Sequence, residues 1–172
     1  MKKLVLVILA VVLVSSSTFA EGAANAGQFG LQTALTFTSV GPGFAGDLGA
    51  KYLITSNIAV RAALGLSSTS AAGASTTLFD VAAGVEYHFG GKGGVSPYAG
   101  AEISYSGASV PAGKGPSSFG LNGVFGGEYF FSSNFSWAGE ARLGFRSDNA
   151  AGATATTIGT AGIATFLTWY IN

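Results

Sequence analysis

Residues 79–89 read FDVAAGVEYHF, and large apolar side chains alternate along them with small, polar or charged ones. Asp80, Glu86 and His88 all fall on the second parity. A period of two residues is typical of a β-strand whose two faces meet different surroundings. The stretch therefore predicts a strand with one apolar face and one face of small or polar residues.

Seven further segments show the same alternation, so that eight follow one another at about 29–37, 47–54, 58–66, 79–89, 99–105, 119–131, 135–146 and 163–171. Their typical length, about 9–13 residues, suits a tilted strand that crosses a membrane. All strand charges fall on the less apolar parity: Asp47, Lys51, Arg61, Asp80, Glu86, Glu102, Glu128, Glu140, Arg142 and Arg146. One face of every segment is thus free of charge.

The composition decides which face meets lipid. Charged residues make up 9% of the chain, whereas a solvated surface carries about 25–35%. A soluble, lipocalin-like barrel with its charges outward is therefore the weaker alternative. An eight-stranded barrel has a lumen just wide enough for side chains, which suits small residues and a few ion pairs. On this register Val81→Arg, on the lipid parity, should be harmful, and Gly84→Ser, on the lumen parity, should be mild.

The first twenty residues have the features of a secretory signal peptide. Lys2 and Lys3 precede the apolar run 4–14, and small residues at Thr18 and Ala20 mark a cleavage site. A retained helical anchor is the alternative, but eleven apolar residues fall short of the roughly 20 that a membrane helix needs. The sequence predicts a signal peptide at 1–20 and one barrel domain at 21–172.

The predicted connections alternate in length. Short turns are expected at 55–57, 90–96 and 132–134, and longer loops rich in small residues at 39–46, 67–76, 106–117 and 147–156. Outer-membrane barrels have short periplasmic turns and longer extracellular loops. With an even number of strands, both ends of the mature chain are expected in the periplasm of a bacterial cell.

Aromatic residues gather near the predicted periplasmic rim. An interfacial girdle is expected to comprise Tyr52, Tyr87, Phe89, Tyr129, Phe131, Trp137 and Trp169. Together these features predict an all-β fold, an eight-stranded antiparallel up-and-down transmembrane β-barrel that follows a cleaved signal peptide.

The signal peptide, the eight alternating segments and turns such as YLITSN at 52–57 resemble those of the OmpA/OmpX-like outer-membrane β-barrel superfamily in its single-domain form. The resemblance covers residues 27–172 and implies insertion by the barrel assembly machinery through the C-terminal strand. Such barrels usually end in an aromatic residue, whereas this sequence ends in Ile171 and Asn172. The resemblance also implies lipid and lipopolysaccharide as surroundings and a monomeric state.

Little in the sequence points to chemistry. No cysteine is present and His88 is the single histidine, so we expect no metal site, no cofactor and no catalytic residue. Some barrels of this size are lipid-modifying enzymes with a Ser–His pair, but no serine lies close to His88 in the sequence. The formal charge of the mature chain, −2, offers no basic patch for nucleic acid.

The charges expected in the lumen are Lys51, Arg61, Asp80, Glu86, Glu102, Glu128, Glu140 and Arg142. Counting across the turn at 55–57 places Lys51 beside Arg61, and two neighbouring cations require carboxylates from across the lumen. Glu86, Glu128 and Glu140 are the candidates. The network is interpreted as a structural plug, with a narrow ion path as the alternative.

The leading functional hypothesis is a non-enzymatic structural or surface-display barrel of the cell envelope. A narrow ion or small-solute channel is the alternative, and a lipid-modifying outer-membrane enzyme is the third and weakest hypothesis.

Overall fold

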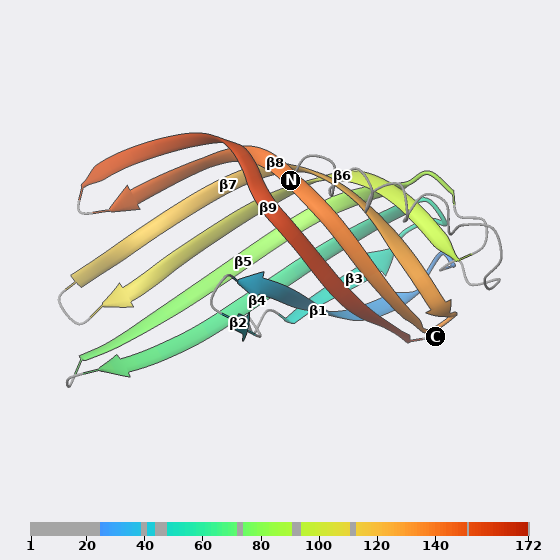
Figure 1. Cartoon of the computed structure of the whole chain (residues 1–172), viewed down its shortest axis with the longest axis horizontal. Coiled ribbons are helices and arrows are strands. Elements are labelled where there is room, and N and C mark those ends of the chain that lie inside the picture. Colours follow the sequence, from blue (N-terminus) through green and yellow to red (C-terminus); the bar gives the residue numbers. More distant parts are fainter. Residues whose placement is uncertain are drawn as a thin grey trace.

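The computed structural model describes residues 25–38, 41–43, 48–71, 74–90, 94–110, 113–150 and 152–171. Within them the chain forms one antiparallel sheet (Figure 1). Its strands are β1 (Phe29–Thr38), β2 (Gly41–Gly43), β3 (Leu48–Leu53), β4 (Ile58–Ala71), β5 (Ala74–His88), β6 (Val95–Val110), β7 (Gly113–Ser132), β8 (Phe135–Ala150) and β9 (Ala153–Ile171). No helix in this part of the chain is long and apolar enough to cross a membrane. The predicted signal peptide and Asp47 lie outside these ranges.

The sheet closes on itself. β1 pairs with β9 from Phe29↔Ile171 to Leu35↔Thr165, and each other strand pairs with its neighbour in the order β1-β3-β4-β5-β6-β7-β8-β9. β2 is a three-residue addition that pairs only with the end of β1. The barrel wall therefore has eight strands, all antiparallel, and the predicted fold class is confirmed.

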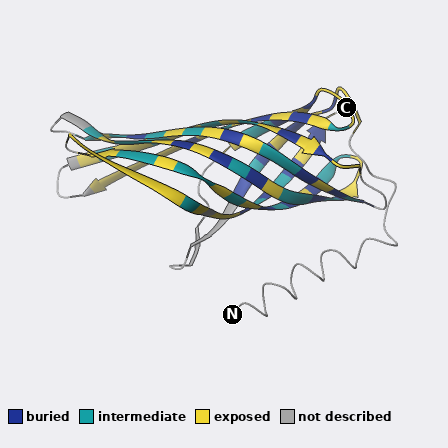
Figure 2. Cartoon of the chain, turned by 90° about the horizontal axis from the view of Figure 1, so that it is seen from above, coloured by how far each residue is buried: buried dark blue, intermediate teal, exposed yellow. Residues whose placement is uncertain are grey.

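Burial alternates along the strands as the sequence pattern predicts, so that buried and exposed residues form a chequered wall (Figure 2). Lys51 is 1% exposed, whereas its neighbour Tyr52 is 44% exposed. Leu64, Val81 and Val85 also lie on the outer surface. The outside of the wall is apolar, and the inside carries the charges.

The connections at 54–57 and 133–134 lie at one end of the barrel, the short-turn end, and residues 89–90 and 94 lie at the same end. The two turns share a motif. In the first turn the hydroxyl of Thr55 accepts hydrogen bonds from the backbone N–H groups of Asn57 and Ile58. The Asn57 side chain donates to the carbonyl of His88 at 2.8 Å, and Asn134 donates in the same way to Tyr170 at 3.0 Å. Each asparagine ties its turn to the end of a neighbouring strand.

We call the opposite end of the barrel the hairpin end. The prediction of long loops at this end is wrong. β4 and β5 stay paired up to Ala71↔Ala74, and the pairs β6–β7 and β8–β9 also continue to the tips of their hairpins. Most of the predicted loop residues at 67–76, 106–117 and 147–156 are therefore strand. The apolar alternation stops there because both faces leave the lipid, but Ser, Thr and Ala can still continue the backbone ladder. Most of the predicted loop at 39–46 lies outside the described residues.

The expectation that Gly84→Ser is mild is also wrong. A Cβ atom at Gly84 would lie 2.9 Å from the carbonyl oxygen of Ala101 and 3.3 Å from the Nε of Arg61. Real Cβ atoms do not approach backbone oxygens this closely, so the strand would have to shift. Sequence parity places a residue on the lumen face but does not tell how tightly it packs there.

We expect Val81→Arg to lower the free energy of unfolding by about 2–4 kcal/mol, because the arginine would face lipid on the outside of the wall. Ala82→Ser is the matched control, since Ala82 faces a polar cavity. The measurement is urea unfolding of the protein in lipid vesicles. Equal losses for the two variants would contradict the assigned facing.

Candidate functional site

Ionised side chains fill the lumen towards the short-turn end. They are Lys51, Arg61, Glu86, Glu102, Glu128, Glu140 and Arg142, which we call the charge plug. They come from six neighbouring strands, β3 to β8, and meet because every one of them lies on the inward parity. Except for Arg142, the side chains of the charge plug are almost completely buried.

Lys51 and Arg61 are direct partners in the β3–β4 ladder, so two cations lie side by side on the inner wall. The ammonium of Lys51 lies 2.6 Å from Glu86 and 2.7 Å from Glu128. Two carboxylates therefore compensate the charge of this buried lysine, and an unpaired ammonium there would be costly.

Arg61 is the centre of the charge plug. Its Nη1 lies 2.9 Å from Glu86 and 2.6 Å from Glu140, and its Nη2 lies 2.7 Å from Glu102. A guanidinium has a planar, rigid set of donors, so it can join three carboxylates from three strands in a fixed arrangement. Arg61 thus links β4 to β5, β6 and β8 across the lumen.

Glu128 is 0% exposed, and each of its two carboxylate oxygens accepts at least one hydrogen bond. One oxygen accepts from Lys51, and the other accepts from the hydroxyls of Ser136 at 2.5 Å and Tyr170 at 2.7 Å. These donors come from β3, β8 and β9, so a single carboxylate connects strands that are far apart in sequence. Such complete satisfaction is what a buried charge requires.

Aromatic side chains complete the seal, and sequence reasoning missed them as members of the site. Tyr98 donates its hydroxyl hydrogen to Glu140 at 3.0 Å. The ring of Phe166 lies 5.4 Å from the guanidinium carbon of Arg61 and 5.7 Å from that of Arg142. Phe130 packs against Tyr170 with ring centroids 5.8 Å apart. Their position on the inward parity was the signal that could have identified them.

His88 has a serine beside it, contrary to what the sequence suggested. The Nδ1 of His88 lies 2.8 Å from the Ser96 hydroxyl, and its Nε2 lies 3.2 Å from Glu86. Ser96 comes from β6, across the turn, which is why a search along the sequence did not find it. Ser96 is 6% exposed and His88 3% exposed, and Glu86 is engaged by both Lys51 and Arg61. A substrate has no access to this trio, which packs as part of the wall lining.

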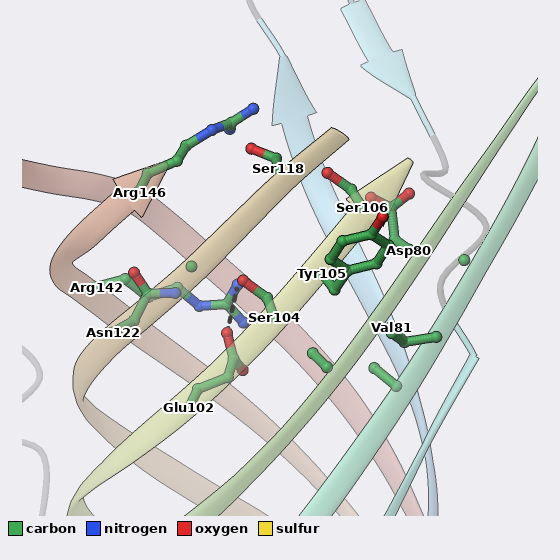
Figure 3. Close-up of a pocket in the computed structure, with 14 residues that line it drawn as sticks. Asp80, Val81, Glu102, Ser104, Tyr105, Ser106, Ser118, Asn122, Arg142 and Arg146 are labelled. Carbon is green, nitrogen blue, oxygen red and sulfur yellow. Dashed lines mark ion pairs between the residues drawn. The ribbon is translucent and has the colours of Figure 1, made fainter. Parts of the chain in front are cut away.

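Above the charge plug, towards the hairpin end, the lumen widens into a polar cavity of about 260 Å³, which we call the vestibule (Figure 3). Its floor is formed by Glu102, Asn122 and Arg142, and Ser104 and Ser106 line its wall. A second cavity of about 90 Å³ lies on the other side of Glu102 and Arg142 and reaches Arg61. Arg142 and Glu102 thus line both cavities.

Arg142 is held by its Nε, which lies 2.6 Å from Glu140. Its Nη1 lies 3.4 Å from Glu102 Oε1, an ion-pair distance without a hydrogen bond. Asp80 lies higher, on the vestibule wall, and is exposed. Arg146 also lines the vestibule and lies 2.7 Å from Asp148. Of the charges expected in the lumen, Asp80 alone lies apart from the charge plug.

The residues of the expected girdle lie on the outer face near the short-turn end. Tyr52, Tyr87, Phe89, Phe131, Trp137 and Trp169 are between 43% and 62% exposed, and Tyr129 is half-buried. Neighbouring rings are in contact: Tyr129 meets Phe131 edge-on at 4.8 Å, and Phe131 stacks on Phe135 at 5.6 Å. Phe135 in turn contacts the ring of Trp169.

The described part of the chain holds no group of three or more His, Cys, Asp or Glu side chains suited to a metal ion. The carboxylates of the charge plug are instead occupied by lysine and arginine.

Residues 6–162 match the family model of the outer membrane protein beta-barrel domain. The chain belongs to this family. Members of this family are bacterial outer-membrane proteins, so the barrel is assigned to the bacterial outer membrane.

Among solved structures, OprG from Pseudomonas aeruginosa is similar at 13% identity and a TM-score of 0.47, over 86% of this chain and 96% of that one. Neisserial surface protein A is similar at 22% identity and a TM-score of 0.39, over 83% and 92%. Ail, the attachment invasion locus protein of Yersinia pestis, is similar at 13% identity and a TM-score of 0.36, over 83% and 93%. No curated protein has a significantly similar sequence.

We expect Glu128→Ala to lower the free energy of unfolding by about 3–5 kcal/mol, because it leaves Lys51 under-compensated in a buried site. The double variant Lys51→Met/Glu128→Leu removes both charges and should recover most of the loss. Urea unfolding in lipid vesicles measures both. A double variant as unstable as the single one would show that the ion pair is not the cause.

Proposed function

We propose that this protein is a non-enzymatic barrel of the outer membrane, with a lumen closed by side chains, that supports the envelope and displays its hairpin end at the cell surface. The charge plug carries the proposal. Its buried ion pairs connect the six strands from β3 to β8, and the aromatic rings around it fill the remaining lumen.

Orientation follows from the strand count. The described chain enters β1 and leaves β9 at the short-turn end, and the girdle lies at the same end. In outer-membrane barrels the short turns face the periplasm, which supports a periplasmic location for both ends of the mature chain. The apolar wall is then surrounded by lipid and lipopolysaccharide, and the barrel assembly machinery would engage β9. The proposed state is a monomer, because closure leaves the spanning part of the wall without a free edge.

A narrow ion or small-solute channel is the second candidate. The vestibule and the smaller cavity favour it, since Arg142 and Glu102 line both of them. Below the smaller cavity, however, Arg61 and its carboxylates block the path. A lipid-modifying enzyme is the least supported candidate, because the Ser–His contact found within the described residues, Ser96 with His88, is buried.

Orientation can be tested with single-cysteine variants, since the chain has no cysteine of its own. Ser70 and Ser56 are both exposed, at the hairpin end and the short-turn end respectively. A membrane-impermeant maleimide should label Ser70→Cys on intact cells and Ser56→Cys only after lysis. The reverse pattern would overturn the proposed orientation.

Closure of the lumen can be tested in planar bilayers. The unchanged protein should give no porin-like steps, whereas Arg61→Ala should raise the current by removing the guanidinium that holds Glu86, Glu102 and Glu140 together. Asp148→Asn, a charge change outside the charge plug, serves as the control and should leave the current unchanged. A large, steady current from the unchanged protein would favour the channel.

A further inference from the structure

The floor of the vestibule contains a buried polar side chain without a partner. Asn122 is 8% exposed, and its carboxamide forms no hydrogen bond within the described part of the chain. Most buried polar side chains have at least one hydrogen-bond partner, because removing a polar group from water without one is costly. Asn122 lines the vestibule, so a molecule in this cavity can supply the missing partner.

The carboxamide of Asn122 turns its nitrogen towards the cavity. A Cβ atom on Gly144, which lies opposite Asn122 on β8, would collide with the amide oxygen, so this oxygen points towards Gly144. A Cβ atom on Gly120 would lie 3.7 Å from the amide nitrogen and close to the hydroxyl oxygen of Ser104. Gly120 and Ser104 line the vestibule. The side of Asn122 that faces the cavity is therefore the hydrogen-bond donor.

Arg142 adds further donors to the same floor. Its side chain is 25% exposed and lines the vestibule. Its Nε donates to Glu140, whereas neither terminal nitrogen donates a hydrogen bond within the described residues. Glu102 Oε1, by contrast, is buried and faces Arg142. The floor thus presents N–H groups to the cavity and turns the oxygens of Asn122 and Glu102 away from it.

The charges of the vestibule decide what kind of ligand suits these donors. The described lining holds two cations and two carboxylates, namely Arg142, Arg146, Asp80 and Glu102. Arg142 already lies close to Glu140 and Glu102, so an anion bound to it would add a third negative charge at one guanidinium. A cation would meet donors at the floor. The floor is therefore suited to a neutral ligand that presents an oxygen as acceptor.

The part of the lining that comes from β4 and β5 has a different character. Ala63 and Ala82 are ladder partners there, and Ala82 lies beside Ser104 of β6. A small apolar group of a ligand can pack against these two methyl groups. Figure 3 shows Ser104, Asn122 and Arg142 together at the polar side of the cavity. The volume of about 260 Å³ is below the roughly 300–1,000 Å³ of pockets for drug-sized ligands, so the ligand is small.

We propose that the vestibule binds a small neutral amide of the acetamide type. Its carbonyl oxygen accepts hydrogen bonds from the side-chain nitrogens of Asn122 and Arg142. Its N–H group donates to the hydroxyl of Ser104, and its methyl group packs against Ala82. One planar group thus satisfies the buried amide of Asn122 and leaves the charge balance of the lining unchanged. Binding of such a ligand does not depend on the orientation of the barrel in the membrane.

Acetamide, acetate and acetamidinium are matched probes, because they share one planar shape and are neutral, negative and positive respectively. Each is titrated at constant ionic strength into the protein in detergent micelles, isotope-labelled in its alanine methyl groups. Acetamide should give saturable shifts of the Ala63 and Ala82 methyl resonances and a nuclear Overhauser effect from its own methyl group to Ala82. Tighter binding of acetate or of acetamidinium, or no saturation with acetamide, would overturn the proposal.

Variants at Asn122 test the assigned donor. Asn122→Asp keeps the shape of the side chain but replaces the donor by an acceptor, so it should reverse the preference from acetamide to acetamidinium. Asn149→Asp makes the same change at an exposed residue outside the vestibule lining and should leave the preference as it is. If Asn122→Asp does not fold, Asn122→Leu takes its place and should weaken acetamide binding about fivefold, the loss of one hydrogen bond. An unchanged preference in Asn122→Asp, or unchanged acetamide binding in Asn122→Leu, would overturn the proposal.

Discussion

The pairing of β1 with β9 is the constraint on which the rest of this structure depends. In lipid no water is available to backbone N–H and C=O groups, so a sheet that crosses the membrane has to satisfy all of them by closing. Closure at Phe29↔Ile171 joins the two ends of the described chain at one rim. Closure also creates a lumen, and in an eight-stranded barrel the lumen is only wide enough for side chains. The seven groups of the charge plug are therefore forced into contact with one another.

This confinement explains why the charge plug is built around arginine. Three carboxylates from β5, β6 and β8 converge on Arg61, and a guanidinium can donate to all of them without changing shape. Lys51, a compact point charge, bridges two carboxylates, those of Glu86 and Glu128. The ion pairs cross the lumen, so they also hold distant strands in register. The same groups that close the lumen thus contribute to the rigidity of the wall.

The two ends of the barrel follow different rules. At the short-turn end, Asn57 and Asn134 tie their turns to neighbouring strands, and the girdle rings pack on one another outside. Towards the hairpin end the charge plug gives way to the vestibule, with Ser, Asn and a few exposed charges. The lumen is thus closed towards one end and widens into a cavity towards the other. This asymmetry underlies the proposed orientation.

Much of the barrel was already determined by the amino-acid sequence. The period of two, with every strand charge on one parity, predicts strands, facing and closure, because lipid tolerates no other arrangement of such a chain. The adjacency of Lys51 and Arg61 could also be counted across a short turn. The hairpins were predicted as loops because their Ala, Ser and Thr residues show no apolar alternation once both faces meet water. Only the tertiary structure decided that the strands continue, that Ser96 lies against His88, and which carboxylate meets which cation. These contacts join strands distant in sequence, and they depend on how the closed sheet tilts and staggers, which no local pattern encodes.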